Sequence, residues 1–346
     1  MIQTRAKPAS EPTNLIVGLL PQKNKGERPM TCIRCKHSEA NRFGFYGRNK
    51  IQRYRCPSCK STFSEPRQKP LGRHYVSTEK AAQITRLMME GMSIRAISRF
   101  TGVHQGTILS LLITVGEKCR NLFSARVRNI HPRFVQADEL WTFVHTKEGH
   151  LYGDASNEWG DQYIWMAIDS ETKMVLSYFV GKRIPASADE FIRDLSERVI
   201  GRFQITTDGL RSYIPCIEER FAADVDFAQL LKIYGKSNSE GPDWYNPSHV
   251  KAIVLIPISG DPKIEHISTS HVERANLSVR THLRRFTRLS LGFSKTLEHL
   301  TAAVHLYMAF FNFCRVHQTL RVTPAMQAGI TDHVWSVQEL LTWAAN

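Results

Sequence analysis

Two cysteine pairs place the strongest constraint on how this 346-residue chain can fold. Cys32 and Cys35 form one Cys-x-x-Cys pair, Cys56 and Cys59 form a second, and 20 residues separate the pairs. This spacing is typical of a four-cysteine zinc site, in which four thiolates complete a closed tetrahedron around one structural ion. A redox-active dithiol is the alternative. We expect a zinc ribbon or knuckle over residues 30–66 that holds one Zn²⁺.

Positive charge is concentrated in the first part of the chain. Residues 1–135 contain 25 Lys and Arg against 7 Asp and Glu, whereas the remainder contains 21 against 25. Such a division favours a nucleic-acid-binding module in front of a different domain, although a basic surface that serves only solubility is the alternative. Residues 1–29, rich in Pro, Lys and Asn, are expected to form a flexible extension. The longest apolar stretch, residues 302–313, is too short and too interrupted for a membrane helix, so no membrane partner is expected.

Residues 76–120 show the pattern of an all-α helix-turn-helix domain. Capping residues and apolar spacing predict helices over 80–90, 93–100 and 104–117, the first capped by Thr78. An ordinary helical hairpin is the alternative. In a helix-turn-helix the last helix enters the major groove of DNA. The residues expected nearest the bases are His104, Gln105 and Thr107.

Residues 132–325 are expected to form an α/β domain, followed by a C-terminal tail over 326–346. Extended, β-branched and aromatic runs predict strands at 134–137, 163–168, 174–180 and 203–207, with a helix over 188–200 before the last of them. Asp138 follows the first run and Asp208 follows the fourth. Because ligands gather at the carboxyl ends of strands in α/β sheets, both aspartates are candidates for one site.

Glu273 is the third candidate carboxylate, near the start of a helix that we expect to run to about residue 289. Val272, Val279, Leu283 and Phe286 would form its buried stripe. The alternative is that Glu273 simply belongs to a solvent-exposed helix face of acidic and basic residues. Three carboxylates from two strand ends and a helix could hold two Mg²⁺ or Mn²⁺ ions about 4 Å apart for in-line phosphoryl displacement.

Local motifs around these residues resemble a known family. They are Gln-Ala-Asp-Glu-Leu-Trp at 136–141, Thr-Asp-Gly at 207–209, His-Val-Glu-Arg-Ala-Asn at 271–276, and Asn-Phe-Cys-Arg-Val-His-Gln-Thr-Leu at 312–320 followed by Thr-Pro-Ala-Met. In this order, and behind the cysteine pairs, they resemble bacterial insertion-sequence DDE transposases of the IS-one type with an N-terminal zinc module. Residues 242–261 form a loop without a counterpart in the pattern.

The resemblance implies an RNase H-like catalytic fold with Asp138, Asp208 and Glu273 as the metal-binding triad. It also implies a DNA-contacting or supporting role for Asn276, a homo-oligomer, and a bacterial cytoplasmic protein associated with the nucleoid.

The resulting hypothesis is a DNA transposase that binds double-stranded element ends and target DNA, cuts strands and transfers them. Arginines of the helix expected to carry Glu273 would contact DNA phosphates and make DNA binding salt-dependent. They are Arg280, Arg284, Arg285 and Arg288. A DNA-binding regulator with an inactive catalytic domain and an RNase H-like nuclease that cuts without joining are the alternatives.

Overall fold

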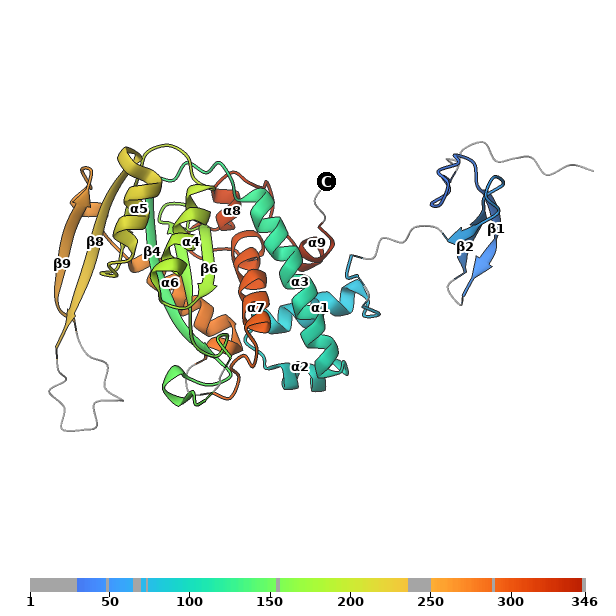
Figure 1. The fold of residues 1–346 in the computed structure, drawn as a ribbon, viewed down its shortest axis with the longest axis horizontal. Coiled ribbons are helices and arrows are strands. Elements are labelled where there is room, and N and C mark those ends of the chain that lie inside the picture. The colour runs from blue at the N-terminus through green and yellow to red at the C-terminus, as the bar shows by residue number, and fades with distance from the viewer. Residues whose placement is uncertain are drawn as a thin grey trace, which may run out of the picture. The chain divides into compact units, whose positions relative to one another are not determined.

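The computed structural model describes residues 30–47, 50–64, 70–72, 74–153, 156–235, 250–287 and 290–343. Residues 1–29, the expected extension, lie outside these ranges. The chain divides into two compact units, Met1–Gln68 and Lys69–Asn346, which are described separately (Figure 1).

The first unit is a three-stranded antiparallel sheet in the order β1-β2-β3. The strands are β1 (Asn41–Tyr46), β2 (Ile51–Arg55) and β3 (Thr62–Ser64). Its buried residues are Cys32, Tyr54, Cys56 and Phe63, and the two aromatic rings stack with centroids 5.9 Å apart. A core of this size is too small to stabilise a fold of fewer than about 40 residues without a metal or a cross-link.

The second unit begins with three helices, which are α1 (Thr78–Met89), α2 (Ile94–Thr101) and α3 (Gln105–Arg126). Ser77, one residue before the expected Thr78, caps α1 by accepting a hydrogen bond from the amide of Lys80. Ser93 caps α2 as expected. Gly102 adopts a φ of +73° after α2, a conformation that glycine reaches without a Cβ clash.

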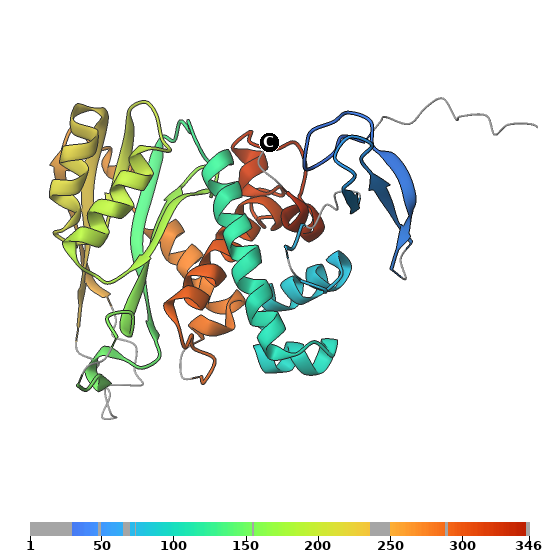
Figure 2. The ribbon, with the colours of Figure 1, turned by 45° about the vertical axis from the view of Figure 1, so that its right-hand side comes forward.

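Helix α3 continues nine residues past its expected end at Glu117. Its continuation buries Cys119, Leu122 and Phe123, because α3 packs beside α7 (Leu297–Ala309) over much of its length (Figure 2). One continuous hydrophobic core therefore joins the three N-terminal helices to the rest of the second unit.

A six-stranded mixed sheet has the order β6-β5-β4-β7-β8-β9. The strands are β4 (Phe134–Val144), β5 (Gly160–Asp169), β6 (Val175–Gly181), β7 (Phe203–Thr207), β8 (Val225–Tyr234) and β9 (Val250–Ser259). The first three pair antiparallel, β4, β7 and β8 pair parallel, and β9 pairs antiparallel with β8. The remaining helices are α4 (Pro185–Ser196), α5 (Tyr213–Phe221), α6 (Ser270–His282), α8 (Pro324–Gln327) and α9 (Val337–Thr342).

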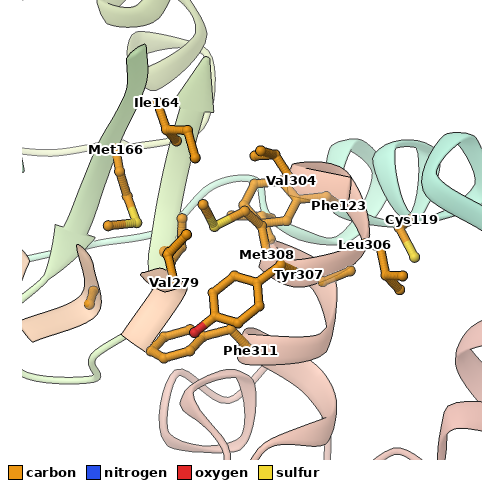
Figure 3. Packing of buried hydrophobic residues seen from close by; sticks show 14 of the residues in the cluster. Cys119, Phe123, Ile164, Met166, Val279, Val304, Leu306, Tyr307, Met308 and Phe311 are labelled. Atoms are coloured by element: carbon orange, nitrogen blue, oxygen red, sulfur yellow. The ribbon is translucent and has the colours of Figure 1, made fainter. Parts of the chain in front are cut away.

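Helices cover both faces of the sheet, and side-chain alternation along β5 divides its residues between them. Trp165 packs against Phe191 of α4 and Tyr213 of α5. Figure 3 shows Ile164 and Met166 on the other side, among residues of α6, α7 and α3. The sheet confirms the expected α/β class.

Two expectations about the segment before and through α6 are wrong. Residues 250–259 form strand β9 rather than a loop, while 242–249 lie outside the described residues. Helix α6 ends at His282, because Leu283 has an extended backbone, and a 3₁₀ turn over Arg284–Phe286 follows. The expected apolar residues Val279 and Phe286 are nevertheless buried. Within the described ranges, no helix is both long and apolar enough to span a bilayer.

Candidate functional site

Strand pairing brings the two predicted aspartates together. Strand β7 ends at Thr207, which pairs with Ala137 of the parallel strand β4, so Asp208 comes level with Asp138. One carboxylate oxygen from each of Asp138, Glu139 and Asp208 lies within 4.8 Å of the others. The middle of β4 and the carboxyl end of β7 thus form an acidic cluster in the middle of the sheet, because β4 continues to Val144 instead of ending before Asp138 as expected.

A pocket of about 830 Å³ opens over this cluster. Its lining includes Asp138, Asp208 and Glu273, together with residues of β8. Glu273 projects from α6, and its side chain is 42% exposed. Glu139 differs, because its side chain is only 2% exposed. The structure therefore brings the three predicted carboxylates to one pocket and adds a fourth that is sealed from solvent.

The buried side chain of Gln136 fastens α6 to the sheet. Its Oε1 atom accepts hydrogen bonds from the amides of His271, at 2.8 Å, and Val272, at 3.3 Å. These are donors at the N-terminal end of α6, which have no partner within the helix. Asn276, one turn further along, donates from Nδ2 to Oδ2 of Asp138 at 2.9 Å. Gln136 and Asn276 together fix the position of α6 relative to Asp138.

We predict that Gln136→Leu lowers the free energy of unfolding by about 2–4 kcal/mol, because it leaves two amide donors at the buried start of α6 without an acceptor. Urea unfolding followed by circular dichroism measures the change. The matched control is Gln338→Leu on the exposed side of α9, for which a change below about 0.5 kcal/mol is expected. Equal stability of the two variants would show that Gln136 does not anchor α6.

Basic side chains already pair with the acidic groups. The Arg183 guanidinium bridges two of them, with Nη2 at 3.0 Å from Oε2 of Glu139 and 3.1 Å from Oδ2 of Asp208. Lys232 of β8 donates to Glu273, which also accepts a hydrogen bond from Thr269 at 2.5 Å. The charges of Asp208 and Glu273 are therefore partly compensated without any metal ion.

Burial and like charge dominate the titration of the cluster. Desolvation, then the nearby Asp208 carboxylate, raises the pKa of Asp138 to about 7. The same two causes raise the pKa of Glu139 to about 7, against the opposing hydrogen bond from Tyr213. Desolvation also raises the pKa of Asp208, although the amide of Leu210 and the Arg183 charge oppose it.

The chemistry of this cluster fits a divalent cation. Carboxylate oxygens are the ligands that Mg²⁺ prefers, and Asp138 and Asp208 present theirs at one pocket. Burial first, and then the neighbouring Asp208 carboxylate, raise the pKa of Asp138, and a bound cation would offset the repulsion between the two carboxylates. Asp138, Glu139 and Asp208 present carboxylate oxygens close enough together to hold an ion, and Glu273 lines the same pocket.

The four cysteines of the first unit form a second possible metal centre. Sγ atoms lie 3.6 Å apart for Cys32 and Cys59 and 3.5 Å apart for Cys35 and Cys56. Zn–S bonds of about 2.3 Å in a tetrahedron require sulfur atoms about 3.8 Å apart. Each pair closes the same turn, in which the amide four residues after the first cysteine donates to that cysteine's carbonyl. The thiols thus fit one zinc ion.

The predicted base-contacting residues lie at the start of α3. His104 caps the helix by accepting a hydrogen bond from the amide of Gly106, and it is exposed, as is Gln105. Thr107 is half-buried in the first turn.

The predicted DNA-contacting side chains around α6 have different surroundings. Asn276 is buried against Asp138. Arg280 donates to the carbonyl oxygens of Trp141 and Phe286. Arg285 donates to Ser294 at 2.9 Å, and burial lowers the pKa of its guanidinium to about 10. Arg284 is exposed, and Arg288 lies outside the described residues.

Sequence reasoning missed several residues of the site. Strand alternation along β4 puts Glu139 on the face opposite Asp138, where it pairs with Arg183 and Tyr213. Asp208 follows the end of β7, and Arg183, which also pairs with Glu139, donates a hydrogen bond to it. Because Arg183 and Lys232 carry no local motif, only the register of the sheet identifies them.

Comparisons with known proteins give low similarity. The chain shares 14% identity with a piggyBac transposase from a synaptic complex with hairpin DNA, at a TM-score of 0.35, over 78% of this chain and 70% of that one. It shares 16% identity with the Mos1 transposase of a strand transfer complex, at a TM-score of 0.19, over 44% and 59% of the two chains. No family profile and no curated protein sequence matches this chain.

Proposed function

We propose that the chain is a DNA transposase that cuts DNA strands and joins them to a target with the help of divalent cations. The observation that carries this proposal is the convergence of Asp138, Asp208 and Glu273, from β4, β7 and α6, on one open pocket. The sequence motifs around these residues resemble DDE transposases. An RNase H-like catalytic fold is supported by the order β6-β5-β4-β7-β8, in which three antiparallel strands are followed by parallel ones.

Each carboxylate has a distinct role in this proposal. Asp138 and Asp208 lie close enough together to share cations, and Glu273, which lines the same pocket, would complete the ligand set. Bound Mg²⁺ would lower the pKa of an attacking water or 3′-hydroxyl and stabilise the leaving oxygen. Asn276 orients the Asp138 carboxylate through its hydrogen bond, and Gln136 fixes the position of the start of α6 on the sheet.

Glu273 is a better third ligand than Glu139 because of its exposure. Glu273 opens to the pocket, whereas the Glu139 carboxylate is enclosed by Tyr213 and Arg183. Glu139 acts instead as a positioning residue, since it holds the guanidinium that contacts Asp208.

We predict that Glu273→Gln reduces cleavage by more than about 1,000-fold, since it removes a direct ligand. Glu139→Gln should reduce cleavage about 10- to 100-fold and raise the Mg²⁺ concentration for half-maximal rate, as expected for a residue behind the ligands. Cleavage of labelled DNA across a Mg²⁺ titration separates the two effects. A larger loss of cleavage for Glu139→Gln than for Glu273→Gln would indicate that Glu139 is the metal ligand and Glu273 the positioning residue.

The remaining parts of the chain supply DNA recognition. The proposal assigns base contacts to His104, Gln105 and Thr107 at the start of α3, and one structural Zn²⁺ to the four cysteines. Arg284 is the exposed candidate for a phosphate contact next to α6. Holding two element ends requires a homo-oligomer, which light scattering of the DNA complex would detect.

A cleavage-and-joining assay tests the function directly. Purified protein is incubated with Mg²⁺ or Mn²⁺ and labelled duplex DNA from the flanks of its own gene, with a supercoiled plasmid as target. Joined products support a transposase. Cut strands without joining indicate a nuclease of the same fold, and tight binding without cutting indicates a DNA-binding regulator.

A further inference from the structure

Strand β1 in the first unit carries aromatic rings that its core does not use. Tyr54 and Phe63 supply the buried aromatic pair, whereas every residue of β1 is exposed. Phe43 is 47% exposed and Tyr46 is 62% exposed. Exposing large rings costs hydrophobic stabilisation, so their position is informative about binding.

Register places Tyr46 on the face away from the core. Opposed residues in a strand pair share one face of the sheet. Tyr46 pairs with Ile51, which shares its face with Arg53 and Arg55, while the buried Tyr54 points to the other face.

A bulge in β1 brings a second ring to this outer face. The register shifts between Arg42 and Phe45, around Gly44 with a φ of +71°. The Arg55 guanidinium lies 5.5 Å from the centre of the Phe43 ring. We name Phe43, Tyr46, Arg53 and Arg55 the aromatic–arginine face. Phe45, although 66% exposed, pairs with Gln52 and belongs to the opposite face.

Charge around this face favours a polyanion. Residues 30–64 contain eight Lys and Arg against one acidic residue, Glu39. Arg53 also donates to Thr62 of β3 at 2.8 Å, which holds its guanidinium against the outer side of the sheet. Rings interleaved with guanidinium groups offer stacking surfaces next to phosphate-binding groups.

We propose that the aromatic–arginine face binds single-stranded DNA, with unpaired bases stacked on Phe43 and Tyr46 and phosphates next to Arg53 and Arg55. Unpaired bases can expose a π-face to each ring, whereas bases inside a duplex are covered on both faces by their neighbours. Phenylalanine also has no group that reads a base edge. The choice of DNA over RNA rests on the proposed function, while the stacking argument is independent of the acidic site.

The experiment measures binding of the full-length, zinc-loaded protein to fluorescein-labelled oligo-dT of 20 nucleotides, in buffer without Mg²⁺. The double variant Phe43→Ala/Tyr46→Ala is expected to weaken binding at least about 10-fold, because each stacked base contributes about 1–3 kcal/mol. Phe45→Ala is the matched control on the same strand and should change binding less than about twofold. The double variant should also change binding to a dT·dA duplex by less than about twofold.

Further measurements keep the test decisive. Zinc content of the double variant should stay at the level of the unmodified protein, and Phe43→Leu/Tyr46→Leu, which keeps apolar bulk without a π-face, should show the same loss. Unchanged oligo-dT binding in both double variants, or an equal loss with Phe45→Ala, would overturn the proposal. Tighter binding to oligo-U than to oligo-dT would overturn the assignment to DNA. Because no cleavage is needed, these outcomes are separate from the test of the catalytic function.

Discussion

Asp208→Asn is expected to abolish Mg²⁺-dependent cleavage, with a loss of more than about 1,000-fold and DNA binding retained. The substitution keeps the shape of the side chain but removes the charge that Asp208 contributes where β7 ends beside β4. An amide is a poor substitute for a carboxylate at a site that must hold Mg²⁺. Its loss also leaves the Arg183 guanidinium paired with Glu139 alone. Cleavage of labelled duplex at saturating Mg²⁺ measures the effect.

The matched control is Asp224→Asn, which changes the same residue type at an exposed position between α5 and β8. It should cleave at the rate of the unmodified protein. Retention of cleavage by Asp208→Asn would contradict the assignment of the triad. Loss of DNA binding along with cleavage would show that Asp208 acts on the fold or on DNA recognition rather than on the reaction.

Removal of zinc is expected to unfold the first unit and leave the second intact. The buried core of the first unit contains two of the cysteines themselves beside Tyr54 and Phe63, so little apolar packing remains without the metal. Metal binding to four cysteines contributes about 10–16 kcal/mol to folding in small zinc modules. Cys56→Ser should therefore lose the bound zinc and become sensitive to protease over residues 30–64. The helices and sheet of the second unit should keep their melting temperature.

Cys216→Ser is the control for this experiment, since Cys216 lies on α5 in the second unit. It should retain zinc and protease resistance in the first unit. Zinc content by atomic absorption and limited proteolysis followed by mass spectrometry report the two properties. A metal-free Cys56→Ser protein whose first unit resists protease would show that the cysteines are not a structural zinc site.

The predicted elements succeeded where local signals are strong. Ser93 caps the start of α2 and Gly102 caps its end, as expected from their residue types. The β-branched runs before Asp138 and Asp208 lie in strands β4 and β7. The prediction failed where packing partners decide the outcome. Helix α3 passes Glu117 because α7 covers its continuation, and β9 forms because β8 offers an open edge.

The sequence by itself determined the chemistry that the chain can carry. The spacing of Cys32, Cys35, Cys56 and Cys59 identified four thiols that the structure gathers within reach of one ion. Runs of β-branched and aromatic residues placed Asp208 at the end of β7, whereas Asp138, expected at a strand end, lies inside β4. Such signals extend over a few neighbouring residues, so a single sequence is enough to read them.

Only the tertiary structure decided which partners each acidic residue has. Glu139 and Asp138 are neighbours in sequence, yet strand alternation directs one to Arg183 and Tyr213 and the other to Asn276 and the pocket. The partners come from segments up to 138 residues away. Their pairing depends on sheet register and on the position of α6, which are set by packing of the whole unit and leave no local pattern in the sequence.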